Sequence, residues 1–176
     1  MNASPWVRRF AINVPAGAEV LDLACGGGRH GRLFLEKGCR MTFADKNLSD
    51  VADLADTENV QLLECDLEDG QAWSFPAARY EAIVVTNYLY RPHLKTMVTS
   101  LKAGGLLIYE TFAVGNEQFG RPKNPDFLLR EGELLEAVAP DMTVLAYEHG
   151  LDDQKVVQRI CAVKKDGAAL FYPLRG

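Results

Sequence analysis

The chain has 176 residues, 48% of them hydrophobic and 24% charged, and it carries a formal net charge of −5 at pH 7. This length suffices for one domain with a substantial core, and the acidic balance argues against a large surface for nucleic acid or anionic membranes. No apolar run reaches the length of a signal peptide or the roughly 20 residues of a membrane span, so we expect neither a leader nor a membrane segment.

The first half of the chain alternates short apolar runs with amphipathic stretches. A helix is expected from Arg29 to Lys37, with Gly38 as its C-cap, and a shorter helix carries Leu48, Val51, Leu54 and Ala55 on one face. Buried strands are expected before and after these helices, at residues 18–25, 40–45, 60–65 and 80–87.

The second half continues this alternation and ends on two strands. Leu94, Met97, Val98 and Leu101 stand at helical spacing, and residues 103–105 are expected to end that helix. A strand at 105–112, a long loop and a helix at 131–138 follow. The last two strands are expected at 142–149 and 156–163, about six residues apart.

Strand–helix alternation of this kind predicts a Rossmann-like α/β fold, with an open, mostly parallel sheet and helices on both faces. The last two strands have no room for a crossover helix between them, so they should form a C-terminal antiparallel hairpin at one edge. Ligands of such sheets bind beyond the carboxyl ends of the strands, so residues that follow different strands become candidates together.

The strongest motif follows the first strand. Gly26, Gly28 and Gly31 form a G-x-G-x-x-G turn that opens a helix, the setting of a dinucleotide-binding turn. Asp22, four residues before Gly26, lies in the apolar run ahead of it. A nicotinamide or flavin cofactor would place its pyrophosphate on the helix N-terminus, where a carboxylate does not help.

S-adenosylmethionine has no phosphate and suits this carboxylate better. Asp22 can organise its amino-acid end directly or through water, while Asp45 at the end of the second strand can accept both ribose hydroxyls. Asp66 after the third strand can accept from the adenine amino group, and Leu67 can contact the ring. The full set of cofactor candidates is Asp22, Ala24, Cys25, Gly26, Gly28, His30, Asp45, Lys46, Asp66, Leu67, Thr86 and Asn87.

Simpler roles stay open for several of these residues. Asp22 could cap backbone amides, Asp45 could be a loop residue or helix cap, and Asp66 could belong to a polar turn. His30 could lie near the cofactor or only cover the glycine turn. Cys25 fits packing better than nucleophilic attack, because the sequence shows no base beside it.

The motif D-x-x-x-G-x-G-x-x-G, followed by Asp45 and by "ECDLED" at residues 64–69, resembles the class I S-adenosylmethionine-dependent methyltransferases over residues 20–112. The segments "SPWVRRF", "TNYLYRP" and "YETFAVGNEQFGRPKNPDFLL" resemble small bacterial members related to the tellurite-resistance type. The resemblance implies S-adenosylmethionine as cofactor and one methyltransferase domain over residues 1–176. Its expected parts are a helical lead-in (1–17), a cofactor-binding core (18–112) and a substrate-side loop, helix and hairpin (113–176).

The acceptor side is less defined by the sequence. No Asn-Pro-Pro signature follows the fourth strand, and we expect a small-molecule acceptor, either anionic or a soft nucleophile, rather than nucleic acid. The candidates for catalytic contact are Tyr88, Arg91, Arg121 and His149. The loop at 113–127 either covers the substrate or is a solvated loop made rigid by its prolines.

Two other functions remain open at this stage: a nicotinamide-dependent oxidoreductase, and a non-catalytic module that binds S-adenosylmethionine. Trp6 and Phe10 could belong to a helix over the cofactor site or to ordinary helix packing. The four cysteines are widely spaced, so we expect reduced thiols in a cytoplasmic protein and no metal site. The sequence does not specify the oligomeric state.

Overall fold

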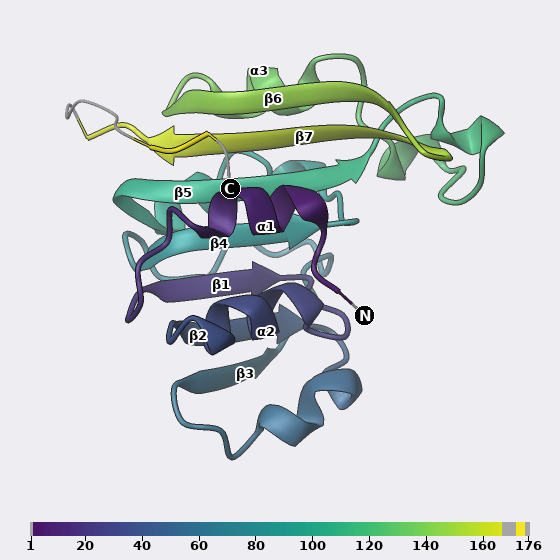
Figure 1. The fold of residues 1–176 in the computed structure, drawn as a ribbon. Helices are drawn as coiled ribbons and strands as arrows, with labels where there is room; N and C mark the ends of the chain where they lie inside the picture. The colour runs from purple at the N-terminus through teal and green to yellow at the C-terminus, as the bar shows by residue number, and fades with distance from the viewer. Residues whose placement is uncertain (1, 167–171, 175–176) are drawn as a thin grey trace.

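The computed structural model describes residues 2–166 and 172–174, and its centre is one seven-stranded sheet (Figure 1). The strand order is β3-β2-β1-β4-β5-β7-β6, with parallel pairing from β3 to β5 and antiparallel pairing of β7 with both neighbours. The predicted Rossmann-like fold with an antiparallel C-terminal hairpin is confirmed. The strands are β1 (Glu19–Leu23), β2 (Arg40–Asp45), β3 (Val60–Glu64), β4 (Tyr80–Thr86), β5 (Leu101–Phe112), β6 (Met142–Asp152) and β7 (Lys155–Lys164).

Helices cover both faces of the sheet. On the face turned to the viewer in Figure 1 lie α1 (Pro5–Ala11) and α2 (Arg29–Glu36), and on the other lies α3 (Glu133–Val138). Successive residues of β4 point to opposite faces, so Val84 packs in the core under α1 and α2 while Ile83 packs in the core on the other side. Both are fully buried, which explains why this strand reads as a continuous apolar run.

The prediction of a helix around residues 94–101 is wrong. The structure has two 3-10 turns there, η2 (Arg91–His93) and η3 (Met97–Ser100), and β5 begins at Leu101. The apolar side chains are buried as their spacing indicated, but Leu101 pairs with Tyr80 across the sheet. Strand β5 therefore includes Leu101, which was expected on the helix, and residues 103–105, which were expected to end it.

Two smaller expectations also differ from the structure. The helix expected near Leu48 is a 3-10 helix, η1 (Ser49–Leu54). The final strands are separated by two residues, because β6 continues to Asp152 and β7 begins at Lys155. Asp153 has a φ of 54°, and this left-handed residue makes the tight turn.

Helix α1 packs on the sheet through its aromatic side chains. Trp6 and Phe10 are buried, and the Trp6 indole nitrogen donates to the Ile160 carbonyl of β7 at 3.3 Å. Ser4 caps the helix by accepting from the Val7 amide. Of the two roles considered for these aromatic residues, the structure shows helix packing.

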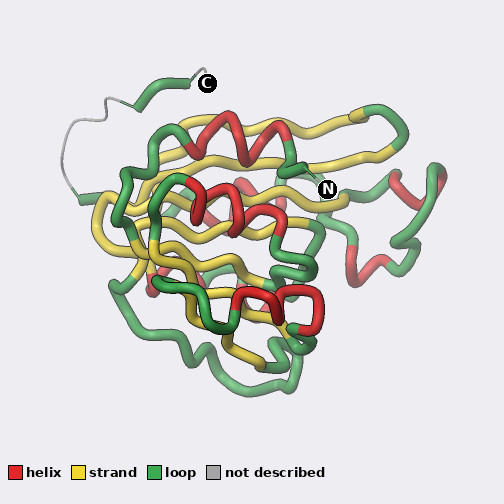
Figure 2. Tube along the Cα trace, turned by 60° about the horizontal axis from the view of Figure 1, so that its bottom comes forward, coloured by secondary structure: helices red, strands yellow, loops and turns green. Residues whose placement is uncertain are grey.

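The loop between β5 and α3 extends beyond the strand ends and contains the short turns η4 (Asn116–Gln118) and η5 (Pro125–Phe127) (Figure 2). All four cysteines are free thiols. Within the described part of the chain, no helix is long and apolar enough to cross a membrane.

Candidate functional site

The glycine turn brings α2 close to β2. Gly28 is the N-cap of α2 and has a φ of 67°. A Cβ atom on Gly31 would lie 2.2 Å from Cε1 of Phe43, so only glycine allows the helix to approach the strand this closely. At Gly28 and Gly31 the backbone and its packing therefore require glycine without any ligand.

The Asp22 side chain is hydrogen-bonded to the backbone of this turn. Its side chain is 1% exposed, and its Oδ2 accepts from the Gly31 amide at 2.8 Å. Burial raises the pKa of Asp22 to about 7, although the Gly31 bond and the Arg29 charge oppose the shift. The structure therefore shows the backbone-capping role, and a contact of Asp22 with a ligand stays a prediction.

Asp45 joins the end of β2 to the same turn. Its Oδ2 accepts from the Gly26 amide at 2.9 Å, and its Oδ1 accepts from the Asn47 amide at 3.2 Å. Each carboxylate oxygen can accept a second hydrogen bond, so these contacts leave capacity for a pair of hydroxyl donors. The side chain is thus held in place by the turn beside which a ligand would lie.

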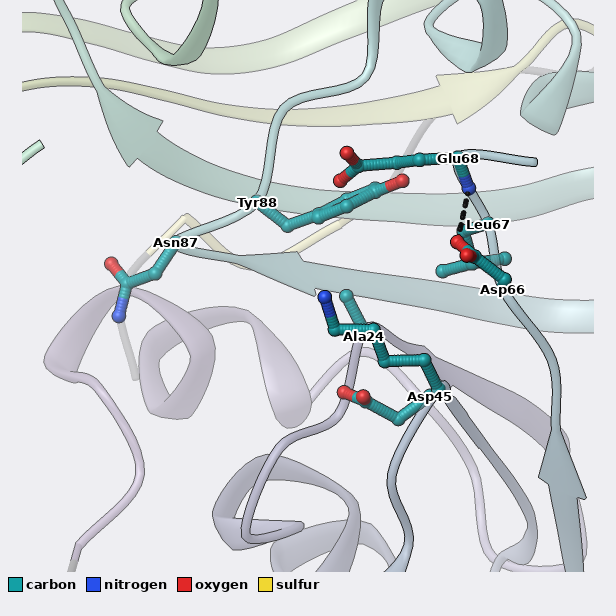
Figure 3. Close-up of a pocket in the computed structure, with 8 residues that line it drawn as sticks. Ala24, Asp45, Asp66, Leu67, Glu68, Asn87 and Tyr88 are labelled. Atoms are coloured by element: carbon teal, nitrogen blue, oxygen red, sulfur yellow. Dashed lines mark hydrogen bonds between the residues drawn. The ribbon is translucent and has the colours of Figure 1, made fainter. Parts of the chain in front are cut away.

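Asp66 follows β3 and is held by a local turn. Its Oδ1 accepts from the Glu68 amide at 2.9 Å, drawn as the dashed line in Figure 3. Between the two residues, Leu67 is largely buried. The prediction that Asp66 belongs to a polar turn is therefore confirmed. The hydrogen bond to the Glu68 amide orients the carboxylate and does not exclude a ligand.

A first cavity of about 250 Å³ gathers the ends of four adjacent strands. Tyr88 and Glu68 lie on one side of it and Asp45 on the other (Figure 3). Three carboxylates line the cavity, an arrangement that favours donor-rich ligands over phosphates. Its lining residues are Ala24, Asp45, Lys46, Asp66, Leu67, Glu68, Asn87 and Tyr88.

A second cavity, of about 440 Å³, shares Ala24 and Asn87 with the first. These two residues follow β1 and β4, the point where strand order reverses, and both have left-handed backbones with φ of 53° and 54°. The second cavity carries positive rather than negative side chains. Its lining residues are Ala24, Cys25, Gly27, Arg29, His30, Arg32, Thr86 and Asn87.

His30 is the buried polar residue of the second cavity. Its Nδ1 lies 3.1 Å from the Thr86 hydroxyl, and its Nε2 has no hydrogen-bond partner among the described residues. Burial and the Arg29 charge lower the pKa of His30 to about 4, so the imidazole is neutral at physiological pH. Burial also raises the pKa of Cys25 to about 12, which keeps it a thiol and fits the packing role.

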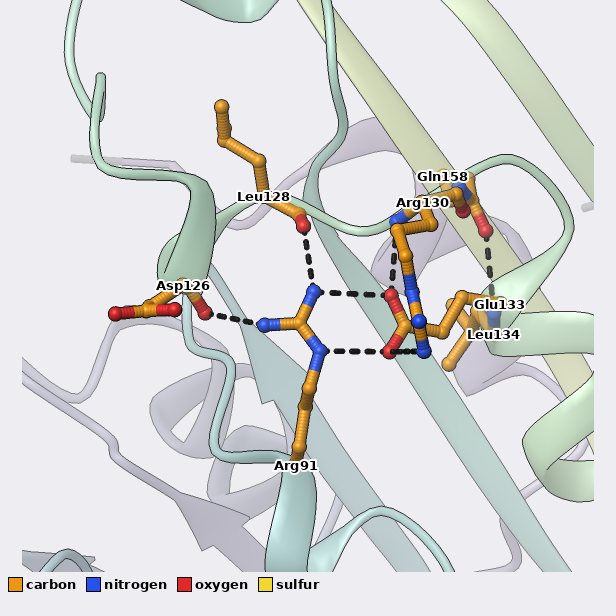
Figure 4. A network of polar contacts seen from close by, with 7 residues as sticks. All are labelled: Arg91, Asp126, Leu128, Arg130, Glu133, Leu134 and Gln158. Atoms are coloured by element: carbon orange, nitrogen blue, oxygen red, sulfur yellow. Dashed lines mark hydrogen bonds and ion pairs between the residues drawn. The ribbon is translucent and has the colours of Figure 1, made fainter.

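Arg91 is occupied by the long loop (Figure 4). Its guanidinium donates to both carboxylate oxygens of Glu133, at 2.7 and 3.0 Å. It also donates to the carbonyls of Asp126 and Leu128, both at 2.8 Å. Arg91 therefore connects the end of β4 to the loop and to α3, and it lines neither cavity.

Glu133 is the centre of this network. It also accepts from the backbone amide and the side chain of Arg130, and buried Gln158 donates to the Arg130 carbonyl at 2.6 Å. Burial opposes ionisation of Glu133, but the hydrogen bonds from Arg91 and Arg130 outweigh it and lower its pKa to about 2. The loop is therefore held to the end of β4 and to α3 by charge-assisted hydrogen bonds.

The remaining acceptor-side candidates lie apart from the cavities. Arg121 is exposed on the long loop, and His149 is exposed on β6, with β5 and β7 between it and β4. Four further lining residues were not predicted from the sequence: Gly27, Glu68, Arg29 and Arg32. Their positions beside the glycine turn and within "ECDLED" were the available signal. In the described ranges, no three His, Cys, Asp or Glu side chains come together as a metal site would require.

No protein-family profile matches the sequence, and no protein of curated function matches it. Solved structures do match. One is a Burkholderia thailandensis 1,6-didemethyltoxoflavin-N1-methyltransferase with bound 1,6-didemethyltoxoflavin and S-adenosylhomocysteine; it is 20% identical, with 92% of this chain and 77% of that chain covered and a TM-score of 0.70. A TehB-like S-adenosylmethionine-dependent methyltransferase from Corynebacterium glutamicum is 19% identical, with 91% and 87% covered and a TM-score of 0.64.

A third structure, the cyclase SpnF, is 15% identical, with 92% and 79% covered and a TM-score of 0.69. The chain therefore has the fold of the class I S-adenosylmethionine-dependent methyltransferases, and the resemblance found in the sequence is confirmed at the level of the fold. The cyclase illustrates that this fold alone does not select a reaction, which depends on the residues of the site.

Proposed function

We propose that this chain is an S-adenosylmethionine-dependent methyltransferase that acts on a small molecule. The observation that carries the proposal is the placement of Asp45 and Asp66 after adjacent strands, in one cavity beside the glycine turn. Ribose hydroxyls are donors for Asp45, and an adenine amino group is a donor for Asp66. The methyltransferase fold of the solved neighbours supports the same cofactor.

The cofactor brings a methyl group already activated by a positive sulfur, so the main task of the chain is positioning. The first cavity suits the nucleoside, and the cavities meet at Ala24 and Asn87, where the methionine portion would pass into the second. Neutral His30 and Thr86 line the second cavity and add polar contacts without adding charge.

The acceptor we propose is small and either anionic or a soft nucleophile. The second cavity has a volume of about 440 Å³, within the range of small-molecule sites. Arg29 and Arg32 line it. The Arg32 guanidinium donates to both carboxylate oxygens of Asp53, at 2.9 and 2.6 Å, so the positive charge that favours an anion comes mainly from Arg29. A thiolate or selenolate acceptor needs no general base, in keeping with a site that pairs a neutral histidine with cationic side chains.

The test is an assay of methyl transfer from labelled S-adenosylmethionine to a panel of thiols, selenols, tellurite, carboxylates and amines. The release of S-adenosylhomocysteine measures turnover with each acceptor. We expect turnover with an anionic or soft member of the panel. Asp45→Ala should weaken cofactor binding by about 1.5–3 kcal/mol, the scale of charge-assisted hydrogen bonds. Asp56→Ala, at an exposed position outside both cavities, is the matched control.

Turnover confined to amines would contradict the proposed acceptor class. Cofactor binding without turnover on any member would favour a non-catalytic binding module. Unchanged cofactor affinity in a folded Asp45→Ala variant would remove Asp45 from the site.

A further inference from the structure

Tyr88 places a hydroxyl group in the first cavity that the protein itself does not satisfy. The residue follows β4, and its ring lies across the cavity from Asp45, with the hydroxyl end toward Glu68 and Asp66 (Figure 3). The oxygen is buried and has no hydrogen-bond partner among the described residues. A buried hydroxyl without a partner is unfavourable, so a ligand atom that could accept from it would bind favourably.

The position of Tyr88 is set by the sheet rather than by a free loop. The Tyr109 hydroxyl donates to the Tyr88 carbonyl at 2.7 Å, and Tyr109 is 1% exposed on β5. The preceding residue, Asn87, donates its amide to the Glu110 carbonyl at 2.9 Å. Two bonds to β5 therefore hold the backbone from which the ring projects.

The hydroxyl is available as a donor. Burial raises the pKa of Tyr88 above its ordinary value, and the charges of Glu68 and Asp66 act in the same direction, so the group stays protonated at physiological pH. The carboxylates around it can only accept hydrogen bonds. Tyr88 thus supplies a neutral hydroxyl donor in a cavity whose other named polar groups are mainly acceptors.

Adenine has both kinds of partner on its edges: an amino donor and ring nitrogens that accept. We propose that Tyr88 is a specificity-determining residue, which donates to a ring nitrogen of the purine while Asp66 accepts from its amino group; this rests on the proposed function. The pair therefore contacts one hydrogen-bond acceptor and one hydrogen-bond donor of the same base. A base that lacks the amino donor or the ring acceptor leaves either Asp66 or Tyr88 without a hydrogen-bond partner.

The test measures, by calorimetry, binding of S-adenosylhomocysteine and its 1-deaza, 3-deaza and 7-deaza analogues to the wild-type chain and to Tyr88→Phe. We expect Tyr88→Phe to bind S-adenosylhomocysteine about 3- to 10-fold more weakly, the scale of one neutral hydrogen bond. For the one analogue that lacks the accepting nitrogen, the two proteins should bind equally.

Tyr147→Phe is the matched control, because the Tyr147 hydroxyl is also buried without a partner in the described chain but lies on β6, outside both cavities. It should leave all four affinities unchanged. Equal binding of S-adenosylhomocysteine by Tyr88→Phe and wild type overturns the inference and leaves the proposed function standing. An equal penalty for all four ligands also overturns it. Absence of binding by the wild-type chain overturns both.

Discussion

Among single residues, the carboxylates at the strand ends divide into two kinds. Asp45 and Asp66 line the cavity that the strand-end rule indicated, because carboxyl ends of neighbouring parallel strands meet at one edge. Asp22 lies within β1, and its carboxylate accepts from Gly31 beneath the turn. The sequence could not separate these roles, since the offset of Asp22 from the glycines suits a backbone acceptor and a ligand contact equally well.

Asp22 should give the protein a measurable pH dependence. Its pKa is about 7 in the folded chain against an ordinary 3.8, so the folded state binds the proton more tightly and the contribution of Asp22 to stability falls as pH rises from about 4 to 7. Asp22→Asn keeps an oxygen acceptor for Gly31 and cannot ionise. Relative to wild type, its free energy of unfolding should rise by about 2–3 kcal/mol between pH 5 and pH 8.

Urea unfolding at both pH values measures this difference. Asp56→Asn removes one negative charge at an exposed position and is the control. A difference between Asp22→Asn and wild type that is the same at pH 5 and pH 8 would show that Asp22 does not titrate in this range.

At the level of elements, periodicity located most strands and helices but could not assign the segment after β4. Leu94, Met97, Val98 and Leu101 have helical spacing and are buried, yet strand pairing of Leu101 with Tyr80 determines the outcome. The role of Arg91 was equally out of reach, because its partner Glu133 and the carbonyls it contacts lie more than 30 residues away in the sequence. Contacts this distant leave no periodic signal.

Arg91 should hold the loop between β5 and α3. Arg91→Met removes four hydrogen bonds, including two to the Glu133 carboxylate, and should lower the free energy of unfolding by about 2–3 kcal/mol. Hydrogen exchange of loop amides from Val114 to Leu129 should speed up. Arg40→Met, which removes an exposed arginine paired with Glu19, should have little effect on either quantity.

A double variant distinguishes loss of the Arg91–Glu133 interaction from non-specific destabilisation. Arg91→Met with Glu133→Met removes both partners, so its cost should be smaller than the sum of the single variants. Loop exchange as slow in Arg91→Met as in wild type would mean that the other contacts of the loop suffice.

For the whole molecule, strand–helix alternation and the short final connection were enough to predict an open α/β sheet with a closing hairpin. The strand order places β1 and β4 side by side, so the two cavities meet at their carboxyl ends. The cavities differ in charge, acidic in the first and basic in the second. That difference comes from Asp45, Asp66 and Glu68 in the first cavity and from Arg29 and Arg32 of α2 in the second. The alternation pattern predicted the strands and this helix, but not which of their side chains line a cavity.

The most direct test of the account is a calorimetric titration of the wild-type chain with S-adenosylmethionine, S-adenosylhomocysteine and NAD in parallel. We expect binding of the first two near micromolar, about −8 kcal/mol, and no heat from NAD. Binding of NAD alone would contradict the proposed cofactor and would indicate that the glycine turn belongs to a nicotinamide-dependent enzyme. Silence from all three ligands would contradict it as well, because the first cavity would then hold no nucleoside.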